Sequence, residues 1–166
     1  ALKIINSGRA RRGLLGLLSR LNLLNKRITA TDLSWTLIPA INATGRLGQP
    51  ELSIQILLEE DPSKRNEIAD KIIGLNTERK SLVSIATELT SYNAQISYEK
   101  LSKICLVVEK SIHRGVIGLI SSKLTQKYHV PSITITCIDD QTAIGSMRSC
   151  RGLECTQFLS QFAELF

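Results

Sequence analysis

Residues 104–108 read Ile-Cys-Leu-Val-Val, five apolar side chains in a row. Such a run is typical of a β-strand that is covered on both faces. Apolar residues at helical spacing follow from Val116 to Tyr128, and Pro131 stops that helix. Residues 133–138 then predict a second strand. A strand, a helix and a strand in this order predict an α/β unit with parallel strands and a right-handed crossover.

Two more elements complete this C-terminal part. A turn at residues 139–141 leads into a third predicted strand, which carries Ser146 and Arg148. Apolar residues from Leu153 to Phe166 lie on one face of a predicted final helix. The sequence therefore predicts a small mixed-sheet α/β domain after a helical N-terminal part.

The N-terminal part has a helical period. Helices are predicted over residues 9–24, over a short segment that starts at Thr31–Asp32, and over residues 50–59. Pro39 disfavours a helical conformation at the residue before it, so residues 39–48 are expected to form a loop between helices. The first helix carries four arginines, which suit a solvated basic face or a phosphate-facing patch.

The longest predicted element opens at Asp61-Pro62. Its apolar residues fall close to a heptad spacing over about six turns: Ile68, Ile72, Leu75, Leu82, Ile85, Ala86 and Leu89. Arg79 interrupts that stripe, and the period changes after Tyr92. We interpret this helix as a packing element that spaces two parts of a larger protein.

Charge and composition narrow the class of protein. The chain has 21 Lys and Arg against 15 Asp and Glu, which gives a net charge of +6. This charge favours an anionic partner such as nucleic acid, but it is equally compatible with an ordinary basic protein that has no such partner. Aromatic residues are only 4%, so few rings are available to stack on bases. No Cys-x-x-Cys pair occurs and no apolar run approaches the roughly 18 residues that a membrane span needs. These features predict a reduced, cytoplasmic protein without a membrane segment.

The sequence Gly-Ser-Met-Arg-Ser at residues 145–149 is the leading candidate site. Ser146 and Arg148 are two residues apart on an extended segment, so their side chains project from the same face. A hydroxyl beside a planar fork of five donors matches the oxygens of a phosphate or a carboxylate, and Gly145 allows close approach to the backbone. The alternative is an ordinary surface strand that carries a serine and an arginine.

Two further segments carry candidate residues. His113 follows the first strand and precedes a helix, where it would either contact a phosphate or assist proton transfer, or simply cap the helix. Asn42 and Arg46 are the polar residues of the predicted loop at 39–48, which is either a functional loop or a plain turn.

Three stretches in order resemble the RecJ family of single-strand-specific DNA exonucleases: PAINATGRLG at residues 39–48, HRGVIGLISSKL at 113–124 and GSMRS at 145–149. Residues 75–80 also resemble a Leu-Asn-x-x-Arg segment of that family. The resemblance covers nearly the whole chain. It implies the tail of a DHH catalytic domain at residues 1–25, a helical connector at 26–100 and an incomplete DHH-associated α/β domain at 101–166. The chain begins without methionine and stops before the family's Gly-Gly-His segment, so we expect a fragment of a larger protein.

The resemblance also implies roles for individual residues. Ser146 and Arg148 are expected to hold a terminal 5′-phosphate, Arg46 to reach a backbone phosphate, and His113 to line the substrate side. Secondary residues of the same motifs are Asn42, Gly115 and Gly145. Arg114 stands where proline is common in the family.

For the parent protein the resemblance implies a 5′→3′ single-stranded-DNA exonuclease of DNA repair and recombination. Two Mn²⁺ or Mg²⁺ ions would be bound by the DHH domain, whose ligands this chain lacks, so we expect the fragment alone to be inactive. Expected partners are single-stranded DNA, the missing DHH domain, and a single-strand-binding protein or a helicase. The alternatives are a DHH-superfamily phosphodiesterase for short RNA or cyclic dinucleotides, and a non-catalytic scaffold for DNA or proteins.

Overall fold

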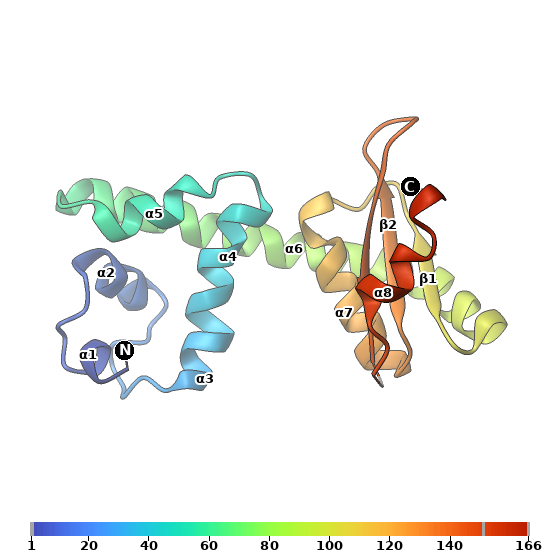
Figure 1. Ribbon diagram of the computed structural model, residues 1–166. Coiled ribbons are helices and arrows are strands. Elements are labelled where there is room, and N and C mark those ends of the chain that lie inside the picture. Colours follow the sequence, from blue (N-terminus) through green and yellow to red (C-terminus); the bar gives the residue numbers. More distant parts are fainter. Residues whose placement is uncertain (1, 151, 166) are drawn as a thin grey trace. The chain divides into compact units, whose positions relative to one another are not determined.

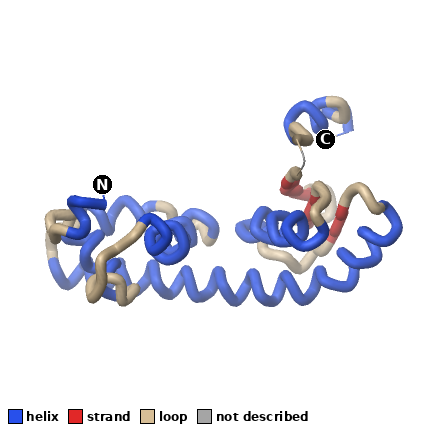
Figure 2. Tube along the Cα trace, turned by 90° about the horizontal axis from the view of Figure 1, so that it is seen from below, coloured by secondary structure: helices blue, strands red, loops and turns tan. Residues whose placement is uncertain are grey.

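A computed structural model describes residues 2–150 and 152–165 of the chain (Figure 1). The chain forms two compact units, residues 1–80 and residues 81–166, and each is described by itself. Strands are found in the second unit, whereas the described part of the first is built from helices and loops (Figure 2). No helix in the described residues is long and apolar enough to span a membrane. The predicted arrangement, helices followed by a small mixed sheet, is confirmed.

The first unit packs helices around one apolar core. Its helices in chain order are α1 (Leu2–Asn6), α2 (Arg12–Arg20), α3 (Ala30–Asp32), the π-helical turn η1 (Leu33–Leu37), α4 (Ile38–Arg46), α5 (Glu51–Leu58) and the first part of α6 (Pro62–Leu101). Leu17, Leu18, Ile56 and Ile72 are at most 1% exposed and form the centre of the core. Arg20 of α2 is paired with Asp70 of α6 at 2.5 Å, which joins the two helices at the surface.

Helix α2 is shorter than the predicted helix over residues 9–24. It ends because Asn22 adopts a left-handed conformation, with φ of +56°. The N–H of Leu23 then donates to the carbonyl of Leu18 at 2.9 Å, which closes the helix end in a Schellman-type turn. Asparagine tolerates this conformation better than most residues. Leu24 therefore lies beyond the helix and is exposed.

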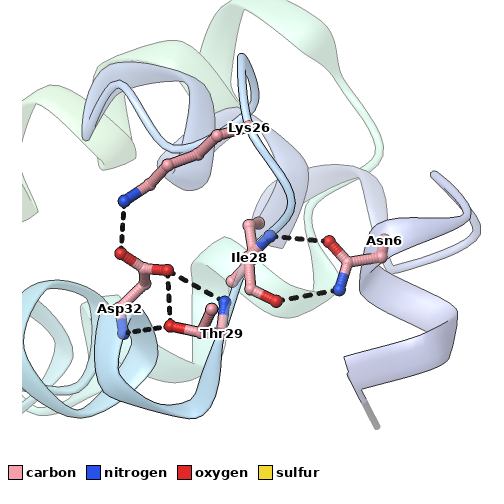
Figure 3. Close-up of polar contacts among 5 residues, drawn as sticks. All are labelled: Asn6, Lys26, Ile28, Thr29 and Asp32. Carbon is pink, nitrogen blue, oxygen red and sulfur yellow. Dashed lines mark hydrogen bonds and ion pairs between the residues drawn. The ribbon is translucent and has the colours of Figure 1, made fainter.

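The segment before α3 is held by side-chain contacts to the backbone (Figure 3). The amide of Asn6 donates to the carbonyl of Ile28 and accepts from its N–H, at 2.9 and 2.8 Å. Thr29 caps α3, and Asp32 bonds back to the N–H of Thr29 at 2.9 Å in a capping box. Lys26 is ion-paired with Asp32. The helix thus starts at Ala30, one residue before the predicted Thr31–Asp32 start.

The prediction that residues 39–48 form a loop is wrong. Ile38 to Arg46 is helix α4, with Pro39 in its first turn, where a residue without an N–H is tolerated. The π-helical turn η1 precedes it, and the N–H of Ile38 donates to the carbonyl of Leu33, five residues back. This change of hydrogen-bond register makes Pro39 a first-turn residue. The helix ends at Arg46, and Gly48 follows two residues later with a φ of +78°, which requires the freedom of glycine.

Helix α6 carries one buried stripe through both units. Its buried residues in the first unit are Ile68, Ala69, Ile72, Leu75 and Asn76, and in the second Val83, Ala86, Thr90 and Ala94. Ile85 and Leu89 belong to the predicted heptad pattern but are 52% and 46% exposed. An α-helix has a period of 3.6 residues, so a buried stripe drifts away from the heptad positions.

The predicted change of period after Tyr92 does not end the helix, which continues to Leu101. Tyr98, near this end of α6, stacks on Tyr128 with ring centroids 4.8 Å apart. The thiol of Cys105 donates to the carbonyl of Ala94 in the same region. Contacts formed only in the folded unit therefore extend the helix beyond its periodic pattern.

The second unit contains a three-stranded sheet in the order β1 (Cys105–Val108), β2 (Ser132–Cys137) and β3 (Ala143–Arg148). β1 and β2 are parallel, as predicted, and β3 is antiparallel to β2. Between β1 and β2 lie a 3₁₀ turn, η2 (Arg114–Val116), and helix α7 (Ile117–Tyr128). The final helix, α8 (Cys155–Ser160), is shorter than predicted and is followed by a 3₁₀ turn at Ala163–Leu165; the predicted end at residue 166 lies outside the described residues.

The described elements cover the sheet unequally on its two faces, which corrects the prediction for residues 104–108. Cys105 and Val107 are buried, whereas Leu106 and Val108 are 39% and 53% exposed. The side of β2 that faces α7 carries Ser132, Thr134 and Thr136, all buried. The open face carries apolar residues and holds a hollow of ≈ 370 Å³ beside Leu159 of the α8 segment. A continuous apolar run does not by itself show whether a strand is covered on both faces of its sheet or on one.

Candidate functional site

Ser146 and Arg148 lie on the same face of β3, as the alternation of a strand requires. Nη1 of Arg148 donates to Oγ of Ser146 at 3.3 Å and to the carbonyl oxygen of Met147 at 2.8 Å. Nε of Arg148 donates to Oγ of Ser122 on α7 at 3.2 Å. Two serines and a backbone carbonyl thus hold the guanidinium in one orientation.

Gly118 of α7 creates the space that this guanidinium occupies. A Cβ atom at this position would lie 2.9 Å from Nη2 of Arg148 and 3.2 Å from Oγ of Ser146. The first distance is shorter than Cβ atoms essentially ever show and the second is tighter than most Cβ contacts, so another residue here would shift the arginine or the serine. Because Gly118 is in the first turn of α7, the cluster lies near the positive end of the helix dipole, which favours an anion.

Gly145 lies on the other face of β3 from the two candidate side chains, and its expected role in close approach to the backbone stays a prediction. A Cβ atom there would meet Cγ1 of Ile135 at 3.5 Å, an ordinary contact on the open face of the sheet. It points away from Ser146 and Arg148, because neighbouring residues of a strand project to opposite faces. The glycine that permits close approach to these side chains is Gly118.

Helix α7 is fastened to β3 beneath the cluster. Ser121 is fully buried, and its Oγ donates to the carbonyl of Ser146 at 2.7 Å. Oγ1 of Thr125 donates to the carbonyl of Arg148 at 3.4 Å. The two hydroxyls fix the backbone that carries the candidate residues, so the cluster is placed by rigid elements rather than by a loop.

His113 is exposed and serves as the N-cap of the turn η2. Its Nδ1 accepts a hydrogen bond from the N–H of Gly115 at 3.1 Å, so the proton of a neutral ring resides on Nε2. Capping was one of the two roles expected from the sequence. An Nε2–H that points to solvent also leaves a donor for a substrate oxygen.

Asn42 and Arg46 belong to the first unit, on α4. They are four residues apart in one helix and therefore share a face. Asn42 is exposed and Arg46 is half-buried in the last turn, where the helix dipole favours a cation. The motif that carries them is thus a helix surface and not a loop.

Sequence reasoning missed Ser122 and Gly118 as members of the site, although both lie in the stretch 113–124. Their spacing of four residues, which places them on one face of a helix, is the signal that points to them. Their contacts with β3 depend on how α7 packs on the sheet, which the sequence does not state.

No metal site is formed by the residues that the structure describes, since no three His, Cys, Asp or Glu side chains come together. The four cysteines are free, with Cys105 buried and the other three half-buried. The cluster of Ser122, Ser146 and Arg148 holds no group that prefers a divalent metal. Its hydrogen-bond donors suit the binding of an anion.

No family model matches the chain. Individual proteins do match it. The single-stranded-DNA-specific exonuclease RecJ of Escherichia coli is 27% identical over 165 residues, which is 98% of this chain and 29% of that protein. RecJ of Bacillus subtilis is 33% identical over 132 residues, 78% of this chain and 16% of that protein. The predicted resemblance to the RecJ family is confirmed. The RecJ-like chain spans less than a third of the length of these curated relatives.

Solved RecJ structures share the fold of the RecJ-like chain. The crystal structure of Thermus thermophilus RecJ in complex with Mg²⁺ has a TM-score of 0.77 and 22% identity, and covers 92% of this chain and 23% of its own. A crystal structure of exonuclease RecJ bound to manganese has a TM-score of 0.72 and 22% identity over 89% of this chain and 35% of its own. The helical part and the small mixed sheet are therefore the architecture of a RecJ region.

Proposed function

We propose that this chain is the substrate-binding part of a RecJ-like exonuclease that degrades single-stranded DNA from the 5′ end in repair and recombination. Its role would be to hold the terminal 5′-phosphate and the strand backbone. The observation that carries the proposal is the orientation of the Arg148 guanidinium, which Ser122 and Ser146 fix over Gly118.

The chemistry of the cluster suits a phosphate. A guanidinium presents parallel N–H donors at the spacing of phosphate oxygens, and the serine hydroxyls add donors that rotate to suit a ligand. The guanidinium is pre-oriented, so less side-chain freedom is lost when an anion binds. Two charges would then act together, the arginine and the positive end of the α7 dipole.

The other candidate residues take supporting roles in this proposal. Arg46 would contact a backbone phosphate, and Nε2–H of His113 would donate to the substrate. Mn²⁺ or Mg²⁺ held by the DHH domain of the parent protein would supply the hydrolytic chemistry, and this chain would orient the strand. A single-strand-binding protein or helicase as a further partner, and the cytoplasm as the location, stay predictions.

The test is binding of oligodeoxythymidine with a 5′-phosphate or a 5′-hydroxyl, measured by fluorescence anisotropy at fixed salt. We expect tighter binding of the phosphorylated strand, and Arg148→Gln to remove that preference with roughly a tenfold loss, the size of a hydrogen bond to a charged group. Arg114→Gln removes the same charge from an exposed residue of η2 and is the matched control. Equal losses on both strands would refute the terminal-phosphate site.

A further inference from the structure

A basic hollow of ≈ 510 Å³ lies in the first unit, where the beginning of α2 meets the end of α5. Gly13 of α2 lies against the backbone carbonyl of Ile56 in α5, which brings the two helices together at this point. Three arginines line the hollow: Arg11 and Arg12 at the beginning of α2, and Arg65 in α6. The arginine-rich stretch that the sequence offered as a phosphate-facing patch thus contributes two guanidiniums to one hollow, and α6 adds a third.

Backbone carbonyls hold two of these guanidiniums. Nη1 of Arg65 donates to the carbonyl of Glu60 at 2.6 Å and to that of Glu59 at 3.4 Å. Nη1 of Arg11 donates to the carbonyl of Leu57 at 3.5 Å. These bonds satisfy carbonyls at the end of α5, which is a structural role, but they use one nitrogen of each guanidinium. Within residues 2–150 and 152–165, the Nε and Nη2 atoms of both arginines have no protein partner, so they are donors that a ligand can use.

Arg12 has no such structural role. It is exposed, and in the part of the chain that the structure describes it has no hydrogen-bond or ion-pair partner. Two carboxylates also line the hollow. That of Glu59 accepts from the N–H of Asp61 at 2.9 Å, and that of Glu60 belongs to an exposed residue. Among the described residues neither carboxylate is ion-paired with an arginine, so the positive charges of the hollow have no bound counter-charge from the protein.

We propose that Arg11, Arg12 and Arg65 form a second phosphate site, which binds one backbone phosphate of a single strand. Guanidinium forks match the oxygens of a phosphodiester, and like charges in one place are stabilised when an anion binds among them. The net charge of +6 favours a polyanionic ligand. This inference rests on the proposed function, since it takes the strand as its ligand, but it concerns the first unit and not the cluster around Arg148.

The experiment measures binding of 5′-hydroxyl oligodeoxythymidine by the chain, by fluorescence anisotropy across a range of salt concentrations. Arg12→Gln should weaken binding roughly tenfold and lower the slope of log K against log salt by about 0.7, the value for one phosphate of a single strand. Arg27→Gln removes the same charge from an exposed arginine outside the hollow, and should change the affinity by less than about twofold. Arg12→Lys should keep the salt slope but bind more weakly, because an ammonium has no fork. Equal losses in Arg12→Gln and Arg27→Gln would show a diffuse effect of charge and overturn the inference.

Glu60→Gln gives a readout of the opposite sign. It removes a negative charge from the lining of the hollow and should strengthen binding of the strand about twofold, because the carboxylate repels a phosphate. Arginines that only satisfy the end of α5 would give no such gain. Glu67→Gln, at an exposed position of α6 outside the hollow, is the matched control and should leave the affinity unchanged. Circular dichroism establishes that each variant is folded; if Arg12→Gln does not fold, Glu60→Gln decides, and an affinity equal to that of the original chain overturns the inference.

The outcomes separate this inference from the proposed function. Unchanged binding by Arg12→Gln, together with loss of the 5′-phosphate preference in Arg148→Gln, overturns the inference and leaves the proposed function intact. Loss of affinity in Arg12→Gln with the 5′-phosphate preference preserved supports both, and a chain that binds neither strand overturns both. If Arg12→Gln loses binding of a polyglutamate peptide but binds the strand as the original chain does, the hollow belongs to an acidic peptide and the inference is overturned.

Discussion

At two glycines of this protein, the absence of a Cβ atom allows a neighbouring group to pack closely. At Gly118 the absence of a Cβ leaves room for Arg148 and Ser146. At Gly13 of α2 it lets the helix approach the backbone carbonyl of Ile56 in α5, where a Cβ atom would collide with that oxygen. A backbone atom in a helix cannot move aside as the end of a flexible side chain can. Gly13 is therefore expected to be a critical position for the stability of the first unit.

Gly13→Ala should lower the free energy of unfolding by about 3 kcal/mol, at the upper end of the usual cost of overpacking. Gly16→Ala, in the same helix with open space around it, should instead raise stability by roughly 0.5–1 kcal/mol, the helix propensity of alanine over glycine. Urea denaturation followed by circular dichroism measures both. Similar effects of the two substitutions would contradict the close packing of α2 and α5.

At the level of elements, side-chain contacts at helix ends set the boundaries. The capping box of Thr29 and Asp32 starts α3, and Lys26 is paired with the same carboxylate (Figure 3). Hydrogen bonds from Lys26 and Thr29 lower the pKa of Asp32 to about 2, from an ordinary value of 3.8. A carboxyl whose pKa is lower in the folded state stabilises the fold above its unfolded pKa and loses that effect as the pH falls.

The stability of the chain should therefore decrease between pH 4 and pH 2 in a manner that depends on Asp32. Asp32→Asn should be less stable than the original chain at pH 6, and the difference should shrink as the pH approaches 2. Thermal denaturation at several pH values measures this, with Glu67→Gln on the exposed side of α6 as the control. A difference that does not vary with pH would mean that the charge of Asp32 has no part in the cap.

Other elements were predicted with unequal success, for physical reasons. The strands and α7 follow from hydrophobic periodicity, because burial of one face imposes that period. Helix α4 is not predicted by the sequence, because a proline followed by small residues, an asparagine and two glycines favours a loop. The π-helical turn that accommodates Pro39 has no sequence signature. The heptad pattern in α6 placed Ile85 and Leu89 in the core, although they are exposed.

For the molecule as a whole, binding and catalysis are expected to be separate properties. The described residues hold phosphate-compatible donors but bring together no metal-binding group. In the proposed RecJ-like parent protein, divalent metal ions held by the DHH domain would supply the hydrolytic chemistry. The chain alone should therefore bind single strands without cleaving them.

Purified chain incubated with radiolabelled single-stranded DNA and Mn²⁺ or Mg²⁺ should release no nucleotides above the buffer control. Thin-layer chromatography measures the release, and a full-length RecJ serves as the positive control. Metal-dependent release that increases with the amount of chain, and that Arg148→Gln reduces, would show that the chain holds a catalytic centre of its own.

The sequence by itself determined the basic charge, the RecJ resemblance and most of the succession of helices and strands. It also determined that Ser146 and Arg148 share a face of their strand. Periodicity and spacing, on which these predictions rest, are local properties of the sequence. Folding alone decided that Ser122 and Gly118 complete the cluster, and that α7 leaves the other face of the sheet open. Each of these contacts joins atoms whose separation is set by the packing of one helix against another element. No local pattern encodes that distance, since it results from the sum of many side-chain contacts across the unit.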